Sequence, residues 1–430
     1  MRVMLDLIER HKRGEAVGIA SVCSAHPIVI EAALRHALAV AAPVALFEAT
    51  CNQVNQDGGY TGMVPADFVR FVHAIAVDVG FDPARIALGG DHLGPNPWTA
   101  LDAAAAMDKA EAMVDAYVAA GFRKIHLDCS MACAGDPVPL PEPVVVERAV
   151  RLCLAAEAAH ARAGGEPPVY VIGTEVPVPG GATEAIEGLE PTTAQAALAT
   201  IEAHRQAFAA AGLEAAWARV VASVVQPGVE FDHHEVVDYR PDAAHALSDA
   251  IASVPGMVFE AHSTDYQTAG ALRALVRDHF AILKVGPGLT FALREALWAL
   301  DAIERETVEP DARANLRELS LARMREQPGH WQRHYHAQGA QLELDLSYSL
   351  SDRIRYYWPD PAIERARQRL FANLRDRPPP LPLLSQHLPH ALHAMREGRA
   401  TRDPHSLVMA HVATVLDDYH RACHPRHDHR

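Results

Sequence analysis

The sequence has few cysteines and no excess of basic charge. Six cysteines are scattered over 430 residues, too sparsely for the disulfide framework of a small secreted protein. Acidic residues outnumber basic ones, and the formal net charge is −15. Because general nucleic-acid binding needs a basic face, we expect no nucleic-acid partner. An acidic protein can still hold a small anion with a few local cations and helix N-termini.

Long apolar segments are also missing. No window approaches 18 apolar residues without a charge, so the sequence predicts no membrane span. The first ten residues mix charged and apolar side chains and contain no small-residue cleavage site, so we expect no signal peptide. With so few cysteines, these features favour a cytoplasmic location.

Two nucleotide-binding signatures do not occur. Residues 21–27, which follow the first apolar run, lack the glycine-rich dinucleotide fingerprint. No Gly-x-x-x-x-Gly-Lys-Ser/Thr sequence is present, so no ATP site of that type is expected. A doubly wound open sheet stays an alternative fold, but it would normally show the first signature.

The sequence does contain an alternation of short β-type runs and longer Ala- and Leu-rich helical windows. Apolar residues make up 49% of the chain, enough for a large core. Eight runs with a helix between each pair predict a (β/α)8 TIM barrel over residues 1–308. The runs are residues 17–22, 44–47, 86–88, 124–127, 169–172, 220–225, 258–259 and 282–285.

The strand period ends near residue 308. Helical windows continue beyond it, with an aromatic cluster at residues 348–358 and a proline-rich link at residues 378–382. We expect residues 309–430 to form a helical extension that packs on the barrel and covers its mouth.

Residues capable of chemistry follow nearly every run on its carboxyl side. In a barrel all these ends share one face, so residues far apart in sequence converge there. Taken singly, each is equally a solvated strand end, but together they predict an active site. In chain order they are His26, Glu48 and Asn52, Asp91 and His92, Asp128 and Ser130, Glu175, Gln226, His262, and Gly286 and Gly288.

Three of these residues are candidate metal ligands. His92, Glu175 and His262 supply two imidazoles and a carboxylate, the ligand type of catalytic zinc or a similar divalent ion. Gln226 could add an amide oxygen, which favours harder ions such as Mn²⁺. The alternative is that the histidines pack in the core or cap helices. We predict a divalent metal cofactor, zinc or manganese.

Two acidic residues are candidate proton carriers. Asp91 would project beside the metal and serve as a general acid/base on a substrate hydroxyl. Glu184 belongs to a loop hinged at Gly180 and Gly181 and could move in once substrate binds. The alternatives are an orienting carboxylate for Asp91 and an exposed acidic loop around Glu184.

Glycine-rich turns after the last two runs are candidate phosphate sites. Barrels commonly hold phosphate there with backbone N–H groups and a helix N-terminus. Lys284 would point inward as a cation or anchor a carboxylate, and a Schiff-base role is a further alternative. The residues predicted to contact substrate or its phosphate are Glu48, Asn52, Asp128, Ser130, Ser263, Thr264, Lys284, Gly286, Gly288 and Arg355.

Five ordered segments resemble the Z-subunit family of D-tagatose-1,6-bisphosphate aldolase. The likeness spans nearly the whole chain, the C-terminal extension included. Members were long labelled tagatose-6-phosphate kinases, although no ATP signature is present here. The segments are Gly-Gly-Asp-His-Leu-Gly-Pro (89–95), Gly-Thr-Glu-Val-Pro-Val-Pro-Gly-Gly (173–181), Phe-Glu-Ala-His-Ser-Thr-Asp-Tyr-Gln (259–267), Lys-Val-Gly-Pro-Gly-Leu-Thr-Phe-Ala (284–292) and Ser-Asp-Arg-Ile-Arg-Tyr-Tyr-Trp-Pro (351–359).

A more distant likeness to class II fructose-bisphosphate aldolases implies roles for individual residues. That family's Asp-His pair corresponds to Asp91 as acid/base and His92 as metal ligand. Its glycine-rich strand and loop correspond to Glu175 as a metal contact and, loosely, Glu184 as a mobile acid. Gln226 stands where that family has another metal-binding histidine, which puts strong zinc binding in doubt.

The resemblance implies two different functions. Stand-alone relatives resemble ketose-phosphate 4-epimerases that interconvert D-tagatose 6-phosphate and D-fructose 6-phosphate by retro-aldol and aldol steps. In paired systems the family supplies an accessory chain for a separate catalytic aldolase subunit. The retained acid, ligands and loop favour the enzyme, which we expect to be a homo-oligomer. A metal-independent sugar-phosphate-binding protein is a third possibility.

Overall fold

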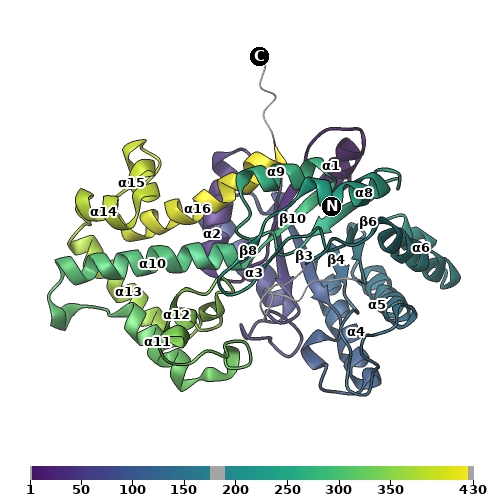
Figure 1. Ribbon diagram of the computed structural model, residues 1–430, viewed down its shortest axis with the longest axis horizontal. Coiled ribbons are helices and arrows are strands. Elements are labelled where there is room, and N and C mark those ends of the chain that lie inside the picture. Colours follow the sequence, from purple (N-terminus) through teal and green to yellow (C-terminus); the bar gives the residue numbers. More distant parts are fainter. Residues whose placement is uncertain (1, 175–188, 425–430) are drawn as a thin grey trace, which may run out of the picture.

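Eight parallel strands close into a barrel in this computed structural model, which describes residues 2–174 and 189–424 (Figure 1). Around the barrel the strands follow the order β1-β10-β9-β6-β5-β4-β3-β2. The predicted TIM barrel is therefore confirmed. The strands are β1 (Ile19–Val22), β2 (Ala45–Thr50), β3 (Ile86–Leu93), β4 (Lys124–Leu127), β5 (Val169–Ile172), β6 (Val220–Val224), β9 (Val258–Ala261) and β10 (Phe280–Val285).

Helices follow the strands and form the outer layer of the barrel. Short 3-10 turns and a two-stranded ribbon of β7 (Glu230–Phe231) and β8 (Val236–Val237) complete the connections. The helices up to the last barrel strand are α1 (Arg2–Lys12), α2 (Pro27–Ala39), α3 (Pro65–Val79), α4 (Ala103–Ala120), α5 (Glu142–Ala163), α6 (Ala194–Ala210), α7 (Glu214–Trp217), α8 (Pro241–Ala252) and α9 (Ala269–Arg277).

The first helix closes the amino-terminal end of the barrel. Met4, Leu7 and Ile8 of α1 are buried in one apolar cluster with Ile19 of β1 and Leu46 of β2. Since apolar side chains of α1 and the strand starts fill this end, the barrel opens to solvent at the opposite end. That end carries the carboxyl termini of the strands, where barrel enzymes place their active sites.

The third strand is longer than the sequence predicted. β3 continues from Ile86 through Leu93, so Asp91 and His92 lie inside the strand and not on a loop after it. Its pairing with β4 shifts register between Gly90 and Leu93, which marks a bulge at this point. Bulges often re-aim side chains next to active sites.

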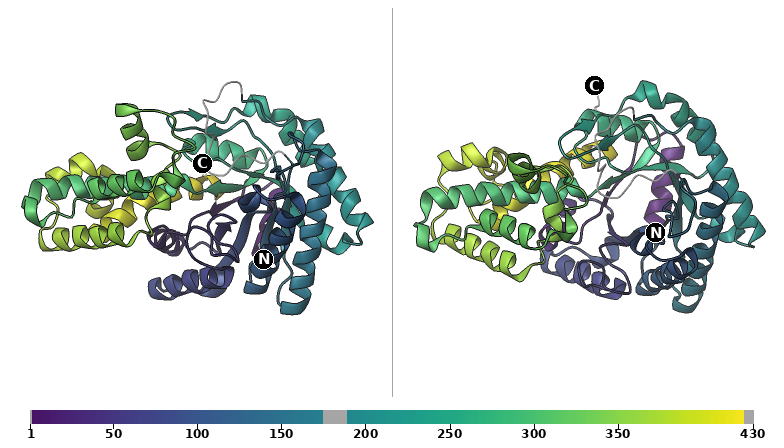
Figure 2. Two further views of the ribbon diagram at one scale, coloured as in Figure 1. Left: turned by 90° about the horizontal axis from the view of Figure 1, so that it is seen from below. Right: turned by 60° about the horizontal axis from the view of Figure 1, so that its bottom comes forward.

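The C-terminal extension is helical and packs on the barrel, as predicted. The long helix α10 leaves the barrel, and both views of Figure 2 place the following helices beside it on one side. α10 (Pro287–Thr307) follows the last barrel strand, and the extension's helices are α11 (Leu316–Glu326), α12 (Gly339–Tyr348), α13 (Pro361–Asp376), α14 (Leu381–His387), α15 (Pro389–Arg396) and α16 (Pro404–Cys423).

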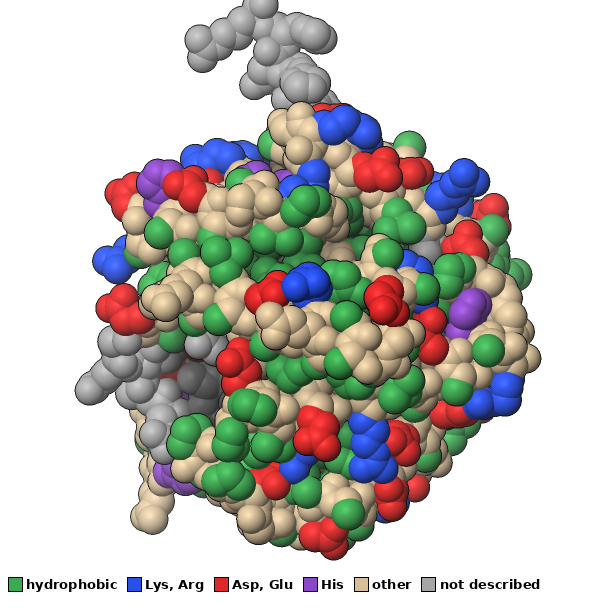
Figure 3. All heavy atoms as spheres, turned by 90° about the vertical axis from the view of Figure 1, so that its right-hand side faces the viewer, with side chains coloured by type: hydrophobic (Ala, Val, Ile, Leu, Met, Phe, Trp, Pro, Cys, Tyr) green, Lys and Arg blue, Asp and Glu red, His purple; other side chains and the backbone are tan. Residues whose placement is uncertain are grey.

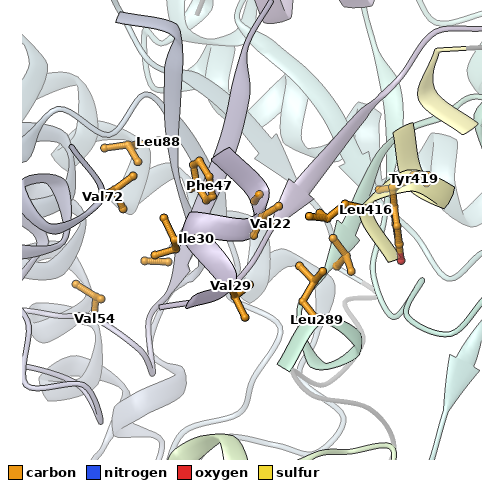
Figure 4. Close-up of a cluster of buried hydrophobic side chains, with 14 of the residues drawn as sticks. Val22, Val29, Ile30, Phe47, Val54, Val72, Leu88, Leu289, Leu416 and Tyr419 are labelled. Carbon is orange, nitrogen blue, oxygen red and sulfur yellow. The ribbon is translucent and has the colours of Figure 1, made fainter. Parts of the chain in front are cut away.

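The last helix returns to the barrel wall. α16 contacts α2, α9, α10 and β1, and its Leu416 and Tyr419 lie near Val22 of β1 and Leu289 of α10 (Figure 4). The N–H of Gly18, just before β1, donates to the carbonyl of Cys423 at 2.9 Å. The end of the chain thus belongs to the barrel's helical layer, while the domain division at residue 308 stays a prediction.

The surface carries mixed charge. On the face drawn in Figure 3, the described Lys and Arg side chains are interspersed with Asp and Glu and do not gather in one basic patch. Within the described part of the chain, every helix is too short or too polar to cross a membrane.

Candidate active site

A cavity of about 350 Å³ opens at the carboxyl ends of the strands. The barrel contributes Asp91, His92, His262 and Lys284 to its lining. The C-terminal extension contributes another wall, made of Arg355, Tyr356, Trp358, Pro359 and Glu364. The structure therefore brings barrel strand ends and the extension together around one small-molecule-sized space.

Charged side chains fill the barrel centre next to this cavity. The ammonium of Lys124 lies 2.7 Å from Glu48 and 2.6 Å from Glu260, and both pairs are fully buried. Lys284 lies 2.7 Å from Glu48 and 2.9 Å from Asp91. A buried ion costs several kcal/mol unless it is paired, so these contacts hold one another in place.

Negative charge exceeds positive charge in this buried group. Four carboxylates (Glu48, Asp91, Asp128 and Glu260) face two ammonium groups (Lys124 and Lys284), and all six side chains are buried. Counted over these six side chains, the group carries an excess of two negative charges. A divalent cation would balance this excess, which is what the donor set of a metal site requires.

A possible metal-binding cluster lies within this group. Asp91, His126, Glu260 and His262 each offer one ligand atom, and these atoms all lie within 4.8 Å of one another. The Nδ1 atom of His126 lies 3.0 Å from Asp91, while its buried Nε2 has no hydrogen-bond partner among the described residues. In the tautomer that donates from Nδ1 to Asp91, the Nε2 lone pair is free for a cation, so these residues fit a divalent metal ion.

His92 is held in the orientation typical of a metal-binding histidine. Its Nδ1 lies 2.7 Å from Asp128, whose other oxygen accepts from the hydroxyl of Ser130 at 2.6 Å. Its Nε2 lies on the Asp91 side, 3.7 Å from that carboxylate. The backbone of His92 has a φ of 50°, a strained value that occurs often at functional sites. Asp128 thus orients the imidazole next to Asp91.

Burial and neighbouring charges set the protonation of Asp91, His92 and His262. Burial opposes ionisation of Asp91, yet His92 and Lys284 hold the pKa of this carboxyl well below its usual value. Burial also opposes protonation of His92, but Asp91 and Asp128 raise its pKa overall. Burial lowers the pKa of His262 to about 4. Near neutral pH, Asp91 is therefore an ionised carboxylate beside a neutral His262.

Gln226, a predicted metal ligand, is engaged elsewhere. The amide oxygen of Gln226 accepts from the backbone N–H groups of Gly228 and Val229 at 2.8 and 3.0 Å. It caps a turn in this structure, so its role as a metal ligand stays a prediction. Glu175 and Glu184 lie outside the described residues.

The N–H groups of the predicted phosphate turn at residues 286–288 have hydrogen-bond partners within the chain. The N–H groups of Gly286 and Gly288 both donate to Asp265, at 2.9 and 2.7 Å, so these donors are already engaged. The hydroxyl of Thr264 donates to the carbonyl of Lys284 at 2.5 Å, which ties the two turns together. Ser263 lines the cavity, as does Asn52 from the second strand end.

Sequence reasoning missed His126, Glu260 and Lys124. All three lie inside strands that we predicted or nearly predicted, and their side chains point to the barrel centre because strand side chains alternate between two faces. Lys124 and His126 stand two apart in an otherwise apolar run. A polar residue at every second position of a buried strand was the signal that could have found them.

A glycine shapes the site through close packing, and we predict that Gly94→Ala destabilises the protein. An added Cβ at residue 94 would lie 1.7 Å from the carbonyl oxygen of Asp128, so the backbone beside the His92 partner must move. We expect a loss of about 3 kcal/mol in the free energy of unfolding, measured by urea titration. Gly329→Ala is the matched control, since a Cβ there meets nothing within 4 Å. Equal stability of the two variants would contradict the packing argument.

Known proteins resemble this chain to different degrees. A family model described as D-tagatose-1,6-bisphosphate aldolase subunit GatZ/KbaZ-like matches residues 4–424. The crystal structure of a probable tagatose 6 phosphate kinase from Sinorhizobium meliloti 1021 is 50% identical with a TM-score of 0.87, covering 94% of this chain and 100% of that chain.

Other structures are much more distant. Fructose-bisphosphate aldolase from Campylobacter jejuni has 14% identity and a TM-score of 0.45, over 87% of this chain and 92% of that chain. The fructuronate-tagaturonate epimerase UxaE from Cohnella laeviribosi has 13% identity and a TM-score of 0.47, over 94% and 82%. Likenesses this weak carry no argument about the site.

Proposed function

The chain belongs to the D-tagatose-1,6-bisphosphate aldolase subunit GatZ/KbaZ-like family, and we propose that it is a ketohexose-phosphate 4-epimerase. Its substrates would be D-tagatose 6-phosphate and D-fructose 6-phosphate. The observation that carries the proposal is the position of the Asp91 carboxylate, which lines the cavity 2.9 Å from the ammonium of Lys284. Such a pair suits proton transfer next to a developing oxyanion.

In this proposal the reaction is a reversible aldol cleavage. Asp91 accepts the proton of the C4 hydroxyl, the C3–C4 bond breaks, and its electron pair moves to C3 and the C2 carbonyl oxygen. The resulting aldehyde rotates, C3 attacks its other face, and Asp91 returns the proton to the C4 oxygen. Lys284 places positive charge beside the oxygens that become anionic.

A divalent ion, zinc or manganese, is the cofactor that fits this site. His126, Glu260 and His262, three members of the cluster described above, would hold it. The predicted ligand His92 packs its ring against both imidazoles. When bound, the ion supplies Lewis acidity to the substrate carbonyl. Asp128 keeps the His92 imidazole in position, and Glu48 with Lys124 fixes the charged wall behind it.

A second candidate function is that of an accessory subunit for a separate catalytic aldolase chain. The description of the matching family model, which names an aldolase subunit, favours it. An accessory chain would show no turnover alone and would raise the activity or stability of an aldolase partner on mixing.

Incubation of the pure full-length protein with D-tagatose 6-phosphate tests the proposal. We expect ¹³C NMR to show D-fructose 6-phosphate forming without a partner chain. We expect EDTA to lower the rate by more than about 100-fold, because Lewis-acid stabilisation is worth several kcal/mol. Addition of Mn²⁺ or Zn²⁺ should restore it. Turnover that appears only with an aldolase partner would favour the accessory role instead.

A further inference from the structure

The extension wall of the cavity places a tyrosine in contact with two arginines. Tyr356 ends the 3-10 turn Arg353–Tyr356, and its side chain lines the same cavity as Asp91. The guanidinium of Arg355 donates to the Tyr356 hydroxyl at 3.0 Å and lies 4.6 Å from the ring centroid. The guanidinium of Arg353 lies 4.9 Å from the same centroid. A phenolate at this position would therefore meet two positive charges.

The two arginines make the Tyr356 hydroxyl a better acid than an ordinary tyrosine. Burial opposes its ionisation, yet Arg355 and Arg353 lower its pKa overall. The neighbouring Tyr60 lines the same cavity, with its ring centroid 4.7 Å from that of Tyr356. Burial raises the pKa of Tyr60. Of these two lining tyrosines, Tyr356 is the one whose surroundings favour the release of a proton.

Tyr356 and Asp91 belong to different parts of the cavity lining. Asp91 lies in β3, where the ammonium of Lys284 is 2.9 Å from its carboxylate. Tyr356 lies in the extension, where its ring packs against Tyr60 and stacks on His330 with the centroids 5.2 Å apart. The two groups have different charge and ring partners, so they meet a ligand in the cavity from separate positions.

The proposed epimerisation needs proton transfer at two positions of one oxygen. The C4 hydroxyl points in different directions in the two ketoses, because the reaction inverts C4. Lys284 and His126 hold the Asp91 carboxylate in one place. After the C3–C4 bond breaks and the aldehyde turns, its oxygen has moved away from the group that took the proton. A second proton carrier on another part of the lining meets this need.

We propose that Tyr356 is the second acid/base group of this site and serves the C4 oxygen of one ketose, while Asp91 serves that of the other. The inference rests on the proposed epimerase function. Asp91 takes the C4 hydroxyl proton as the C3–C4 bond opens. After the aldehyde turns and C3 attacks it, the C4 oxygen takes a proton from the Tyr356 hydroxyl. The phenolate then regains the proton held by Asp91 through solvent, and in the reverse direction the two groups exchange roles.

The rate and substrate affinity of Tyr356→Phe, measured on the full-length protein with Mn²⁺, test this inference. We expect kcat to fall about 10²- to 10⁴-fold in both directions, the usual contribution of a general acid/base. The affinity for D-fructose 6-phosphate, measured by calorimetry, should stay unchanged. Tyr357→Phe is the matched control and should keep the wild-type kcat. Its hydroxyl donates to the carbonyl of Gln327, and Tyr357 lies outside the cavity lining.

Arg353→Met tests whether Tyr356 acts through its acidity. Arg353 contacts the Tyr356 ring from outside the cavity lining, so its loss affects the reaction through that tyrosine. Removal of this positive charge should lower kcat about 10-fold, the equivalent of one pKa unit, and leave the affinity for D-fructose 6-phosphate unchanged. In the Tyr356→Phe background the same substitution should lower kcat no further, because phenylalanine transfers no proton.

Wild-type turnover that Tyr356→Phe retains would overturn this inference and leave the epimerase intact. An equal fall in kcat in Tyr357→Phe, or an additive loss in the double variant, would overturn it as well. If Tyr356→Phe no longer unfolds cooperatively in urea, Arg353→Met decides the question, since unchanged kcat in that variant contradicts the role of Tyr356. Wild-type protein without turnover would contradict the epimerase itself, and this inference with it.

Discussion

The Asp91→Asn variant is expected to lose nearly all epimerase activity, with kcat lower by about 10²- to 10⁴-fold, the usual contribution of a general acid/base. Asparagine keeps the shape and the hydrogen-bonding oxygen of the side chain but cannot carry the transferred proton. The low pKa that His92 and Lys284 impose, against the effect of burial, means that wild-type Asp91 is ionised over the whole neutral range. Conversion of D-tagatose 6-phosphate, followed by NMR, measures the effect.

Binding and unfolding measurements on the same variant show whether it has lost its chemistry or its structure. Asp91→Asn should still bind D-fructose 6-phosphate and unfold in urea as one cooperative unit. Asp249→Asn is the control for loss of a carboxylate, because Asp249 is exposed on α8 and pairs only loosely with His245, at 3.5 Å. Epimerisation by Asp91→Asn at the wild-type rate would show that another group transfers the proton.

The convergence of the site followed from the sequence because barrel topology makes it unavoidable. Eight parallel strands that close on themselves bring their carboxyl ends to one face, whatever the intervening helices contain. Asp91, His92, His262 and Lys284 are spread over nearly 200 residues of sequence and line the same cavity. Short apolar runs with polar residues at their ends were sufficient to expect this.

The inside of the barrel was harder to read from the sequence. The sequence predicted that β3 ends at Leu88, which placed Asp91 on a loop. In the structure the strand continues to Leu93, because Gly89 and Gly90 let it pass bulky neighbours. A Cβ on Gly89 would lie 2.7 Å from the Glu48 side chain. The glycines therefore make room for buried charge and do not end the strand. Only the packed structure shows which neighbour fills that room.

The contribution of the extension could not be predicted for a different reason. The contact of Asp265 with the β10–α10 turn depends on left-handed backbone at Ser263 and Tyr266, which no local pattern specifies. Arg355 reaches the cavity because the 3-10 turn that carries it, Arg353–Tyr356, packs against α10 and α12. Both features come from long-range packing, which the hydrophobic periodicity of the sequence does not reveal.

The Lys124→Met variant is expected to lose about 3–5 kcal/mol in the free energy of unfolding, the cost of removing one partner from a buried ion pair. Methionine has a similar length, so the change removes charge more than volume. Without this ammonium, Glu48 retains Lys284 at 2.7 Å, while the nearest remaining ammonium to Glu260 is Lys284 at 3.8 Å. Urea unfolding in EDTA measures the loss, with no divalent ion present to replace the missing charge.

Two further variants test whether the carboxylate left without its ammonium partner causes the loss of stability in Lys124→Met. Lys109→Met removes an exposed ion pair with Asp57, 2.9 Å apart, and should cost less than about 1 kcal/mol. Adding Glu260→Gln to Lys124→Met should recover part of the lost stability, because the carboxylate left without its partner is then neutral. If the single variant is as stable as wild type, or the double variant is simply the sum of two losses, the charged barrel centre is not held together by Lys124. Divalent cation should also stabilise Lys124→Met more than wild type, since the excess of buried negative charge has grown from two to three.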